Sequence, residues 1–419
     1  MPPFSLGRNL GHFAPFLWKT PAPCRWAVRM GPRPGRVSRL GRKFPCLSPG
    51  EAAAVNGAAS PLLFCKSRTC QVDLRSNFRY NKPQGSDTME LIYGRPFQGA
   101  MLEALKAFLQ ADGLRYDEGV EFTVCVMDGD KIAATGSLDG KICKCIAVSP
   151  AYQGEGLSAT VLTALRKEAF DRSQRHLFLY TKPKNRWMFE DLGFFAVAET
   201  ADTLLMENKR RGLSDFLAAQ TQPETPGVVG AVVANCNPFT LGHRYLMEEA
   251  AKQCDTLHVF ILSEDKSTVP AADRLRLARE GLADLSNVLV HPGGDYLISS
   301  ATFPTYFLKD QAKGAEVFCQ LDLELFATRF APHFGITKRF VGTEPLCQVT
   351  NAYNEAMMAF LPKHGIEVVQ LARKEQADAP ISASRVRALW KAGDFAALAP
   401  LVPETTLAYL KEKVYPIDK

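Results

Sequence analysis

The 419-residue sequence has no apolar run long enough to cross a membrane, because a spanning helix needs about 20 consecutive apolar residues. Its eleven cysteines include no CxxC pair and no cysteine–histidine set at zinc-finger spacing, so no metal site is predicted. No segment repeats at a fixed period, which argues against solenoids and propellers. Scattered cysteines in a chain of this length indicate reduced thiols and a cytoplasmic protein, and the lack of a long apolar run predicts no membrane partner.

Acidic residues are scarce at the start of the chain. Residues 1–88 contain 14 Lys and Arg but 3 Asp and Glu, whereas the remaining 331 residues contain 36 and 41. The net charge of +6 therefore comes from the first segment, and the rest of the chain is weakly acidic. Nucleic-acid-binding proteins usually carry basic charge on the folded domain, so nucleic acid is not a predicted partner.

Residues 1–88 also lack a sustained helical or strand period, and proline and arginine recur in them. We predict that this segment is a basic, disordered extension and that the folded chain starts at Met89. An Arg-rich, acid-poor start is also typical of organelle transit peptides. Its prolines, however, would interrupt the amphipathic helix that such peptides form.

Two folded regions follow, joined by a polar linker at residues 220–226. In residues 89–219, apolar spacing predicts a helix over 97–111, an antiparallel meander and then a helix over 156–171. The meander strands are expected at 121–127, 132–138 and 141–148. Cys143 and Cys145 alternate on the third strand, so the pattern places them on one face. Further along, a strand is expected at 177–181 and a short helix at 186–192.

In residues 227–419 strands and helices alternate, which predicts a mostly parallel sheet with helices on both faces. Strands are expected at 227–235, 256–262, 287–291, 315–319, 337–342 and 366–371. Helices are expected at 241–253, 270–283, 301–312, 322–331, 350–363 and from 384 onward.

The strongest chemical signal is a turn that follows the strand expected at 227–235. The residues Asn237-Pro238-Phe239-Thr240-Leu241-Gly242-His243 open a helix there. Backbone N–H groups and the positive helix end then lie at the carboxyl edge of the sheet, where phosphates bind. Gly242 lets the backbone approach closely, and Thr240 and His243 can face one anion. A lone histidine near a helix start usually caps or packs, but the strand–turn–helix context favours a phosphate site.

This turn resembles the T/HxGH signature of the nucleotidyltransferase superfamily, whose members transfer a nucleotidyl group through attack on an α-phosphate. The resemblance implies catalytic roles for His243 and Thr240, and ATP contacts for Asn237, Phe239 and Gly242.

A second motif, Ile381-Ser382-Ala383-Ser384-Arg385-Val386-Arg387, precedes a C-terminal helix. It resembles the superfamily's ISSTxxR motif, with Ala383 and Ser384 replacing Ser and Thr. Hydroxyls and amides at a helix N-terminus can hold phosphates, and Arg387 can add a charge-assisted contact. Capping alone would explain Ser382 and Ser384. The turn about 140 residues earlier favours ATP binding by both serines and Arg387.

Two further cations lie near the same edge of the predicted sheet. Lys266 follows the second strand, and Arg274 stands on the next helix. Fixed cations stabilise the charge of a phosphoryl-type transition state, so Lys266 is a candidate catalytic residue and Arg274 a candidate ATP contact. Either residue would otherwise be a solvated surface charge. No acidic pair has evident metal spacing, so Mg²⁺ is expected to arrive with ATP.

The first folded region contains Val148-Ser149-Pro150-Ala151-Tyr152-Gln153-Gly154-Glu155-Gly156-Leu157-Ser158, a strand that enters a helix through glycines. It resembles the acyl-CoA pyrophosphate loop of the GNAT acetyltransferases, Q/RxxGxG/A. Gln153, Gly154 and Gly156 are the implied contacts to a CoA-like group, and Ser158 stands where Gly or Ala is usual. The expected fold class is therefore α/β, with a GNAT-like α+β domain followed by a doubly wound, Rossmann-like nucleotidyltransferase domain.

From Met89 onward the chain resembles the citrate lyase ligase family. The most specific stretches are residues 235–246, 294–304 and 339–345. The resemblance implies an acid–thiol ligase that uses ATP and acetate to acetylate the prosthetic-group thiol on the acyl-carrier subunit of citrate lyase. It would proceed through acetyl-adenylate and release AMP and pyrophosphate.

Two alternatives stay open at this point. One is an adenylyltransferase that makes a coenzyme or dinucleotide, with a regulatory, acyl-CoA-binding N-terminal domain; the acyltransferase-type region argues against it. The other is a non-catalytic module that binds CoA or nucleotide. The presence of Thr240, His243, Ser382 and Arg387 argues against the module.

Overall fold

The computed structural model describes residues 79–80, 89–222, 227–263, 267–297, 303–308, 313–344, 348–376 and 379–415. These residues belong to one compact unit, Asp73–Lys419. The disorder predicted for residues 1–88 falls mostly outside the described residues. Arg79–Tyr80, however, forms a short strand, β1, that pairs antiparallel with Met89–Glu90. The boundary predicted at Met89 therefore separates β1 from its partner strand.

The first sheet has eight strands in the order β1-β2-β3-β4-β5-β6-β8-β7. After β1, the strands are β2 (Met89–Gly94), β3 (Phe122–Asp128), β4 (Lys131–Asp139), β5 (Ile142–Val148), β6 (Phe178–Thr181), β7 (Phe195–Glu199) and β8 (Leu204–Glu207). The helices of this region are α1 (Gly99–Ala111), α2 (Leu157–Asp171), α3 (Arg186–Asp191) and α4 (Gly212–Ala218). The meander and both long helices are confirmed, whereas β2, β7 and β8 were not predicted.

A β-bulge in β5 overturns the expected placement of its cysteines. Ser137 of β4 pairs with Lys144, and Thr135 pairs with Ala147, so two residues of β5 oppose Gly136 alone. Cys145 takes a positive φ of 52° there. The extra residue inverts the alternation of side chains. Cys143 and Cys145 consequently pack into different apolar clusters rather than on one face.

The second sheet is entirely parallel, with strand order β11-β10-β9-β12-β13. Its strands are β9 (Val229–Ala234), β10 (Thr256–Ile261), β11 (Val288–Pro292), β12 (Lys338–Gly342) and β13 (Glu367–Leu371). The order runs outward in both directions from β9, so the topological switch point lies between β9 and β12. Ligands of open parallel sheets bind beyond the carboxyl ends of the strands at that point.

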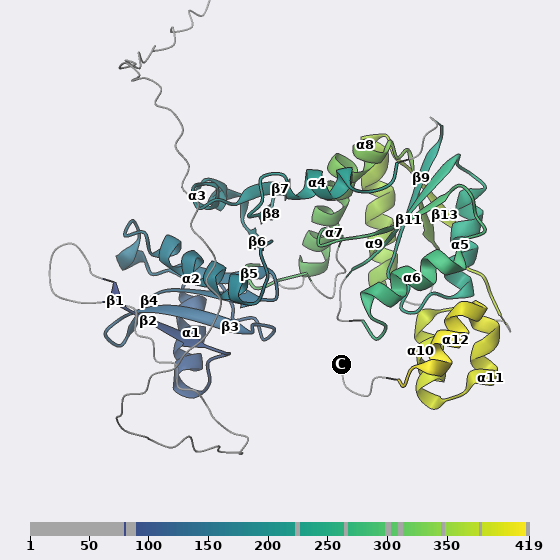
Figure 1. The fold of residues 1–419 in the computed structure, drawn as a ribbon. Coiled ribbons are helices and arrows are strands. Elements are labelled where there is room, and N and C mark those ends of the chain that lie inside the picture. Colours follow the sequence, from purple (N-terminus) through teal and green to yellow (C-terminus); the bar gives the residue numbers. More distant parts are fainter. Residues whose placement is uncertain are drawn as a thin grey trace, which may run out of the picture. The chain divides into compact units, whose positions relative to one another are not determined.

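Helices cover both faces of this sheet (Figure 1). Helices α5 (Leu241–Ala251), α6 (Ala271–Gly281), α10 (Ala383–Ala392) and α12 (Glu404–Glu412) supply one apolar cluster, which includes Phe340. Helices α7 (Gly314–Leu325) and α9 (Gln348–Phe360) supply another, which includes Phe260. The short helices α8 (Ala331–Phe334) and α11 (Phe395–Leu398) complete the region. The expected doubly wound architecture is confirmed.

The segment between β11 and β12 differs most from expectation. The strand predicted at 315–319 is wrong, because these residues lie in α7. Val317, Leu321 and Leu325 are all buried, and their spacing of four places them on one helical face. A π-helical turn, Phe326–Phe330, continues α7 into α8. The helix predicted at 301–312 is also wrong for residues 303–308, which form turns and irregular structure.

Hydrogen bonds join residues of the two folded regions directly. The Tyr296 hydroxyl donates to Glu207 at 2.7 Å, and the Tyr306 hydroxyl donates to the carbonyl of Tyr180 at 2.9 Å. Their side chains are buried in one apolar cluster that draws on both regions. The polar linker at 220–226 therefore does not separate two independent cores.

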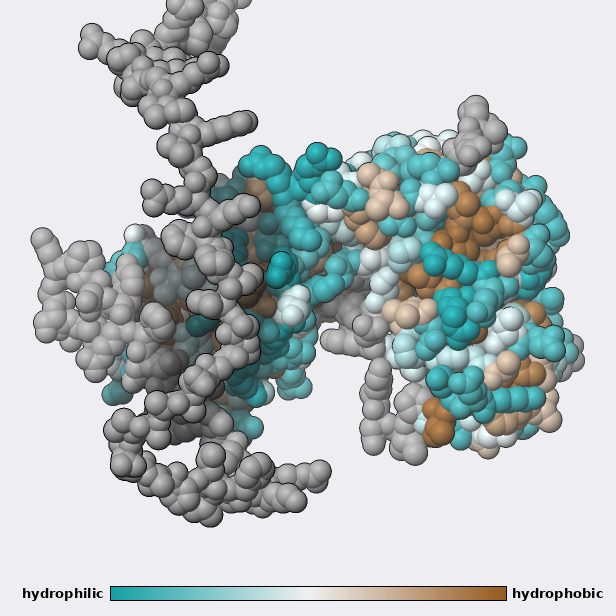
Figure 2. All heavy atoms as spheres, viewed as in Figure 1, coloured by the Kyte–Doolittle hydropathy of each residue, from teal (hydrophilic) through white to brown (hydrophobic). Residues whose placement is uncertain are grey.

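Apolar residues reach the surface between hydrophilic ones in the part that contains the second sheet (Figure 2). Within the described part of the chain, no helix combines the length and the apolar character that crossing a membrane requires.

Candidate active site

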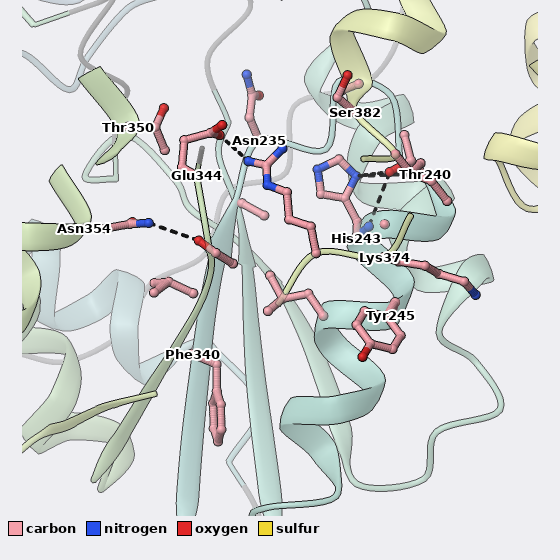
Figure 3. Close-up of a pocket in the computed structure, with 18 of the residues that line it drawn as sticks. Asn235, Thr240, His243, Tyr245, Phe340, Glu344, Thr350, Asn354, Lys374 and Ser382 are labelled. Atoms are coloured by element: carbon pink, nitrogen blue, oxygen red, sulfur yellow. Dashed lines mark hydrogen bonds and ion pairs between the residues drawn. The ribbon is translucent and has the colours of Figure 1, made fainter. Parts of the chain in front are cut away.

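A cavity of about 380 Å³ opens at the switch point of the second sheet. Asn235 follows β9, and Glu344 follows β12, so both line the cavity from the carboxyl ends of neighbouring strands. The first turns of α5 and α10 also line it, as does the start of α9. Figure 3 shows that side chains from these separate segments surround one space.

Thr240 and His243 form a capping box at the start of α5. The backbone N–H of Thr240 donates to Nδ1 of His243 at 3.1 Å, and the hydroxyl of Thr240 lies 2.9 Å from the same nitrogen. The backbone N–H of His243 donates back to that hydroxyl at 3.3 Å. Both residues line the cavity, as expected from sequence, and the contacts between them are visible in Figure 3.

These contacts fix how His243 can act. Because Nδ1 accepts a backbone N–H, the neutral ring carries its proton on Nε2. Burial, together with the nearby Arg373 guanidinium, lowers the pKa of His243 to about 4. The imidazole is therefore neutral at physiological pH and is a hydrogen-bond donor through Nε2. A neutral donor of this kind can stabilise charge that develops on a phosphate oxygen.

Gly242 brings the two helix N-termini close together. A Cβ at this position would lie 2.8 Å from the carbonyl oxygen of Ile381, which is closer than real Cβ contacts. Ile381 immediately precedes Ser382, whose hydroxyl caps α10 by accepting the N–H of Arg385 at 3.2 Å. The first N–H groups of a helix have no partner within it. Two positive helix ends thus converge on one cavity, an arrangement that attracts phosphates.

Arg387 connects the turn before α5 to the first turn of α10 through hydrogen bonds. Its guanidinium donates to the carbonyl of Asn237 at 2.6 Å and to the hydroxyl of Ser384 at 3.2 Å. The Asn237 side chain accepts the backbone N–H of Val269 at 2.9 Å. Ser382 and Ser384 line the cavity, whereas Asn237 and Arg387 do not. The side chains of Asn237 and Arg387 thus hold the turn in place from outside the cavity lining.

Phe239 and Arg274 likewise lie away from the cavity, against the expectation that they contact ATP. Phe239 is fully buried, and its ring stacks on His243 at a centroid distance of 6.0 Å. Arg274 is also fully buried and donates to the carbonyls of Asn235 and Leu262 at 2.8 and 2.7 Å. Arg274 joins the ends of β9 and β10, because strand ends leave carbonyls that need donors. Lys266 lies outside the described residues.

Besides Arg339 of β12, three charged residues that the sequence analysis did not assign line the cavity: Glu344, Arg373 and Lys374. Arg373 forms an ion pair with Glu344 and donates to the carbonyl of Thr343 at 2.6 Å. Lys374 extends over the ring of Tyr245, 5.8 Å from its centroid. These residues directly follow β12 and β13. The rule that ligands bind at carboxyl strand ends would have found them.

Among the described residues, the cavity does not provide a protein cage for a metal ion. No group of three or more His, Cys, Asp or Glu side chains is placed to hold one within the described ranges. Glu344, the carboxylate that lines the cavity, is already paired with Arg373.

The glycine loop of the first region has two glycines with left-handed backbone conformation and open space around them. Gly154 and Gly156 adopt positive φ angles of 87° and 75°, which glycine tolerates best. Gly156 immediately precedes α2, and a Cβ at either glycine would meet open space. Gln153 is exposed beside them. Strands β5 and β6 pair in parallel at only two positions, Ile142 and Cys143.

The fold and the cavity define a class of protein: a GNAT-type acyltransferase fold followed by a nucleotidyltransferase-like parallel sheet with a histidine at the turn after its first strand. Family models agree with this division. Residues 87–194 match the acetyltransferase (GNAT) family, and residues 229–410 match the citrate lyase ligase C-terminal domain.

Relatives that match over most of their own length identify the family. The chain is 44% identical to the [citrate [pro-3S]-lyase] ligase of Klebsiella pneumoniae over 316 residues, which are 74% of this chain and 92% of that protein. It is 42% identical to the ligase of the same name from Escherichia coli K12 over 311 residues, or 73% of this chain and 88% of that protein. The chain belongs to the [citrate [pro-3S]-lyase] ligase family.

Proposed function

We propose that this chain activates acetate with ATP in the cavity of the second sheet and passes the acetyl group to the prosthetic-group thiol of citrate lyase. The family assignment supports the overall activity, since [citrate [pro-3S]-lyase] ligases are acid–thiol ligases that acetylate this thiol. The observation that carries the adenylation step is the neutral His243 at the meeting point of two helix N-termini.

In the first step, a carboxylate oxygen of acetate attacks the α-phosphorus of ATP. The bond from this phosphorus to the bridging oxygen breaks, so that acetyl-adenylate forms and pyrophosphate leaves. Negative charge grows on the bridging oxygen and on the non-bridging oxygens of the α-phosphate. Catalysis of such a transfer consists mainly of positioning and of stabilising that charge.

The residues of the cavity are suited to this task. We assign His243 to donate from Nε2 to an α-phosphate oxygen, and Thr240 to hold the ring in the required orientation. Ser382, Ser384 and the first N–H groups of α10 face the β- and γ-phosphates. The described residues form no cage for Mg²⁺, so we assign none of them as its ligand. A magnesium ion that travels with ATP is held largely by phosphates and water.

In the second step, the thiol sulfur attacks the acetyl carbonyl. The thioester forms, AMP leaves and the thiol proton is released. The prosthetic group is CoA-like, and the loop at Gly154 and Gly156 has the open, positive-φ backbone that a pyrophosphate group can approach. We therefore assign Gln153, Gly154 and Gly156 to bind the prosthetic group before transfer.

Exchange of labelled pyrophosphate into ATP tests the first step. We expect exchange that requires acetate and is lost in His243→Ala. His364→Ala is the matched control, because His364 is exposed and does not line the cavity. Exchange without acetate, or exchange that appears only with a nucleotide acceptor, would contradict the proposal and favour a plain adenylyltransferase.

A further inference from the structure

The cavity extends away from the phosphate-binding turn along one face of α9. Thr350, Tyr353, Asn354 and Met357 line it from this helix, and their spacing of three and four residues places them on the same side. Figure 3 shows Thr350 and Asn354 on the side of the cavity opposite Thr240. A nucleotide held at α5 and α10 leaves this far end for a second reactant.

The end beside α9 contains a buried guanidinium. Arg339 lines the cavity from β12 and is only 4% exposed. Its Nε and Nη1 atoms are buried without a hydrogen-bond partner among the described residues. One face of the guanidinium lies 4.3 Å from the centroid of the Phe326 ring. Buried N–H groups are almost always hydrogen-bonded in proteins, so these two atoms require an explanation.

Nearby acidic groups do not supply the missing partner. Asp322 is close enough to favour the charged form of Arg339, yet no ion pair within 4.0 Å joins the two in the described part of the chain. The hydroxyl of Tyr353 donates to Asp322 instead. Burial raises the pKa of Asp322, and the Tyr353 hydroxyl and Arg339 oppose this shift. A buried cation without an ion pair is costly to the fold, unless a ligand anion completes it.

We propose that Arg339 binds the carboxylate of acetate, and that the wall formed by Met357 and Val341 receives its methyl group. This inference rests on the proposed function, because it assigns the position of the acid that attacks ATP. A planar guanidinium is the side chain best matched to a carboxylate. Arg339 stands on the strand next to β9, so the acid is held on one side of the switch point and the phosphates on the other.

The wall proposed for the methyl group favours an aliphatic acid, while Thr350, Tyr353 and Asn354 line the rest of this end of the cavity. Met357 is 1% exposed and Val341 is partly buried against the same apolar cluster. These side chains offer no hydrogen-bonding group to a second polar substituent. The subsite therefore accepts a short aliphatic monocarboxylate.

Kinetics of the full chain in the pyrophosphate-exchange assay test the assignment. Arg339→Gln should raise the KM for acetate about 10- to 100-fold, the usual effect of losing a charge-assisted hydrogen bond. The KM for ATP should change less than about twofold, because the phosphates bind elsewhere. Arg339→Lys should recover part of the acetate affinity, since lysine keeps the positive charge but lacks the paired N–H donors of the planar guanidinium. Lys338→Gln is the control: Lys338 is the preceding cation of β12 and does not line the cavity.

A binding measurement separates this inference from the proposed function. Acetate should raise the thermal midpoint of the wild type in the presence of an α,β-methylene analogue of ATP, and Arg339→Gln should lose this effect while Lys338→Gln keeps it. If the wild type shows no acetate-dependent exchange, the proposed function fails, and the thermal shift alone then decides the subsite. Equal changes in the KM of acetate and ATP, or an unchanged acetate KM, would overturn the role of Arg339. So would a wild type that acetate does not stabilise.

Met357 gives a second test that does not depend on the folding of an Arg339 variant. Met357→Ala should enlarge the methyl end and raise the kcat/KM of propionate relative to acetate by about tenfold, since one methylene in an apolar pocket discriminates by this order. An unchanged ratio would place the methyl group elsewhere and overturn this part of the proposal.

Discussion

His243→Ala is the substitution that most directly tests the chemistry of the cavity. It removes one neutral donor, Nε2–H, while Thr240 and the two helix N-termini remain. Loss of a single preorganised donor to a transition-state oxygen typically lowers kcat about 10²- to 10³-fold. We expect a loss of this size in acetate-dependent pyrophosphate exchange, with a much smaller change in the KM for ATP. A proportionate rise in the KM for ATP with kcat unchanged would show that His243 stabilises only the ground state.

The protonation state of His243 gives an independent check. Its pKa is lowered to about 4 by burial and by Arg373, so the ring stays neutral as the pH falls through 6.5 and is protonated only near pH 4. Protonation would replace the acceptor at Nδ1 with a donor that faces the Thr240 N–H. The kcat of the wild type should therefore not change through a titration of His243 near pH 6.5. If kcat does fall near this pH, His243→Gln should leave that fall in place, because another group causes it. Arg373→Gln should move the pKa of His243 upward and bring the fall in kcat that His243 protonation causes closer to neutrality. A His243-dependent fall in kcat near pH 6.5 in the wild type would refute the neutral-donor mechanism.

Gly242→Ala should lower acetate-dependent exchange by at least about tenfold, because its Cβ would lie 2.8 Å from the carbonyl oxygen of Ile381 and push the two helix ends apart. The rate of pyrophosphate exchange and the KM for ATP measure this effect. A chain that starts at Met89 should fold with a thermal midpoint close to that of the full chain and keep its activity, because the contact it loses among the described residues is the two-residue pairing of β1. Loss of either property would show that the preceding segment belongs to the fold. Gly156→Asp should spare pyrophosphate exchange but impair acetylation of the citrate lyase thiol, because a carboxylate opposes a pyrophosphate at this loop; Gly156→Asn is the neutral control of similar size, and loss of both activities would contradict the division of labour.

Much of the fold could be predicted because the apolar residues of most elements follow a single spacing, either that of a helix or that of a strand. β9 is a short apolar run that ends at a turn, and α5 begins at a threonine cap. The strand expected at 315–319 failed for a local reason, since Val317, Phe318 and Cys319 together look like a β segment. Only the wider window, with Leu321 and Leu325, shows the helical face that α7 buries. The pair β7 and β8 was missed, and length alone does not account for this, because β6 is equally short and was predicted.

The site was predictable only as far as its residues are contiguous in sequence. Thr240, Gly242, His243, Ser382 and Ser384 belong to two local motifs, and all of them line the cavity. Motif membership alone does not distinguish a side chain that faces a ligand from one that holds the motif in place. The turn after β9 bends so that Phe239 and the side chain of Asn237 point into the protein, where they meet the core and the N–H of Val269.

Residues that meet only through the topology belong to no contiguous motif. Arg339, Glu344 and Arg373 stand on or just after β12 and β13, and they reach the same cavity as α5 only because β12 lies beside β9 across the switch point. The order of the strands in the sheet decides which residues meet at the cavity, and the residue spacing within one segment does not predict that order. A buried arginine within a strand is nevertheless a signal that can be used in advance. Two adjacent cations, Lys338 and Arg339, begin β12, and Arg339 is the buried one. A charge inside a parallel sheet needs either a partner or a ligand.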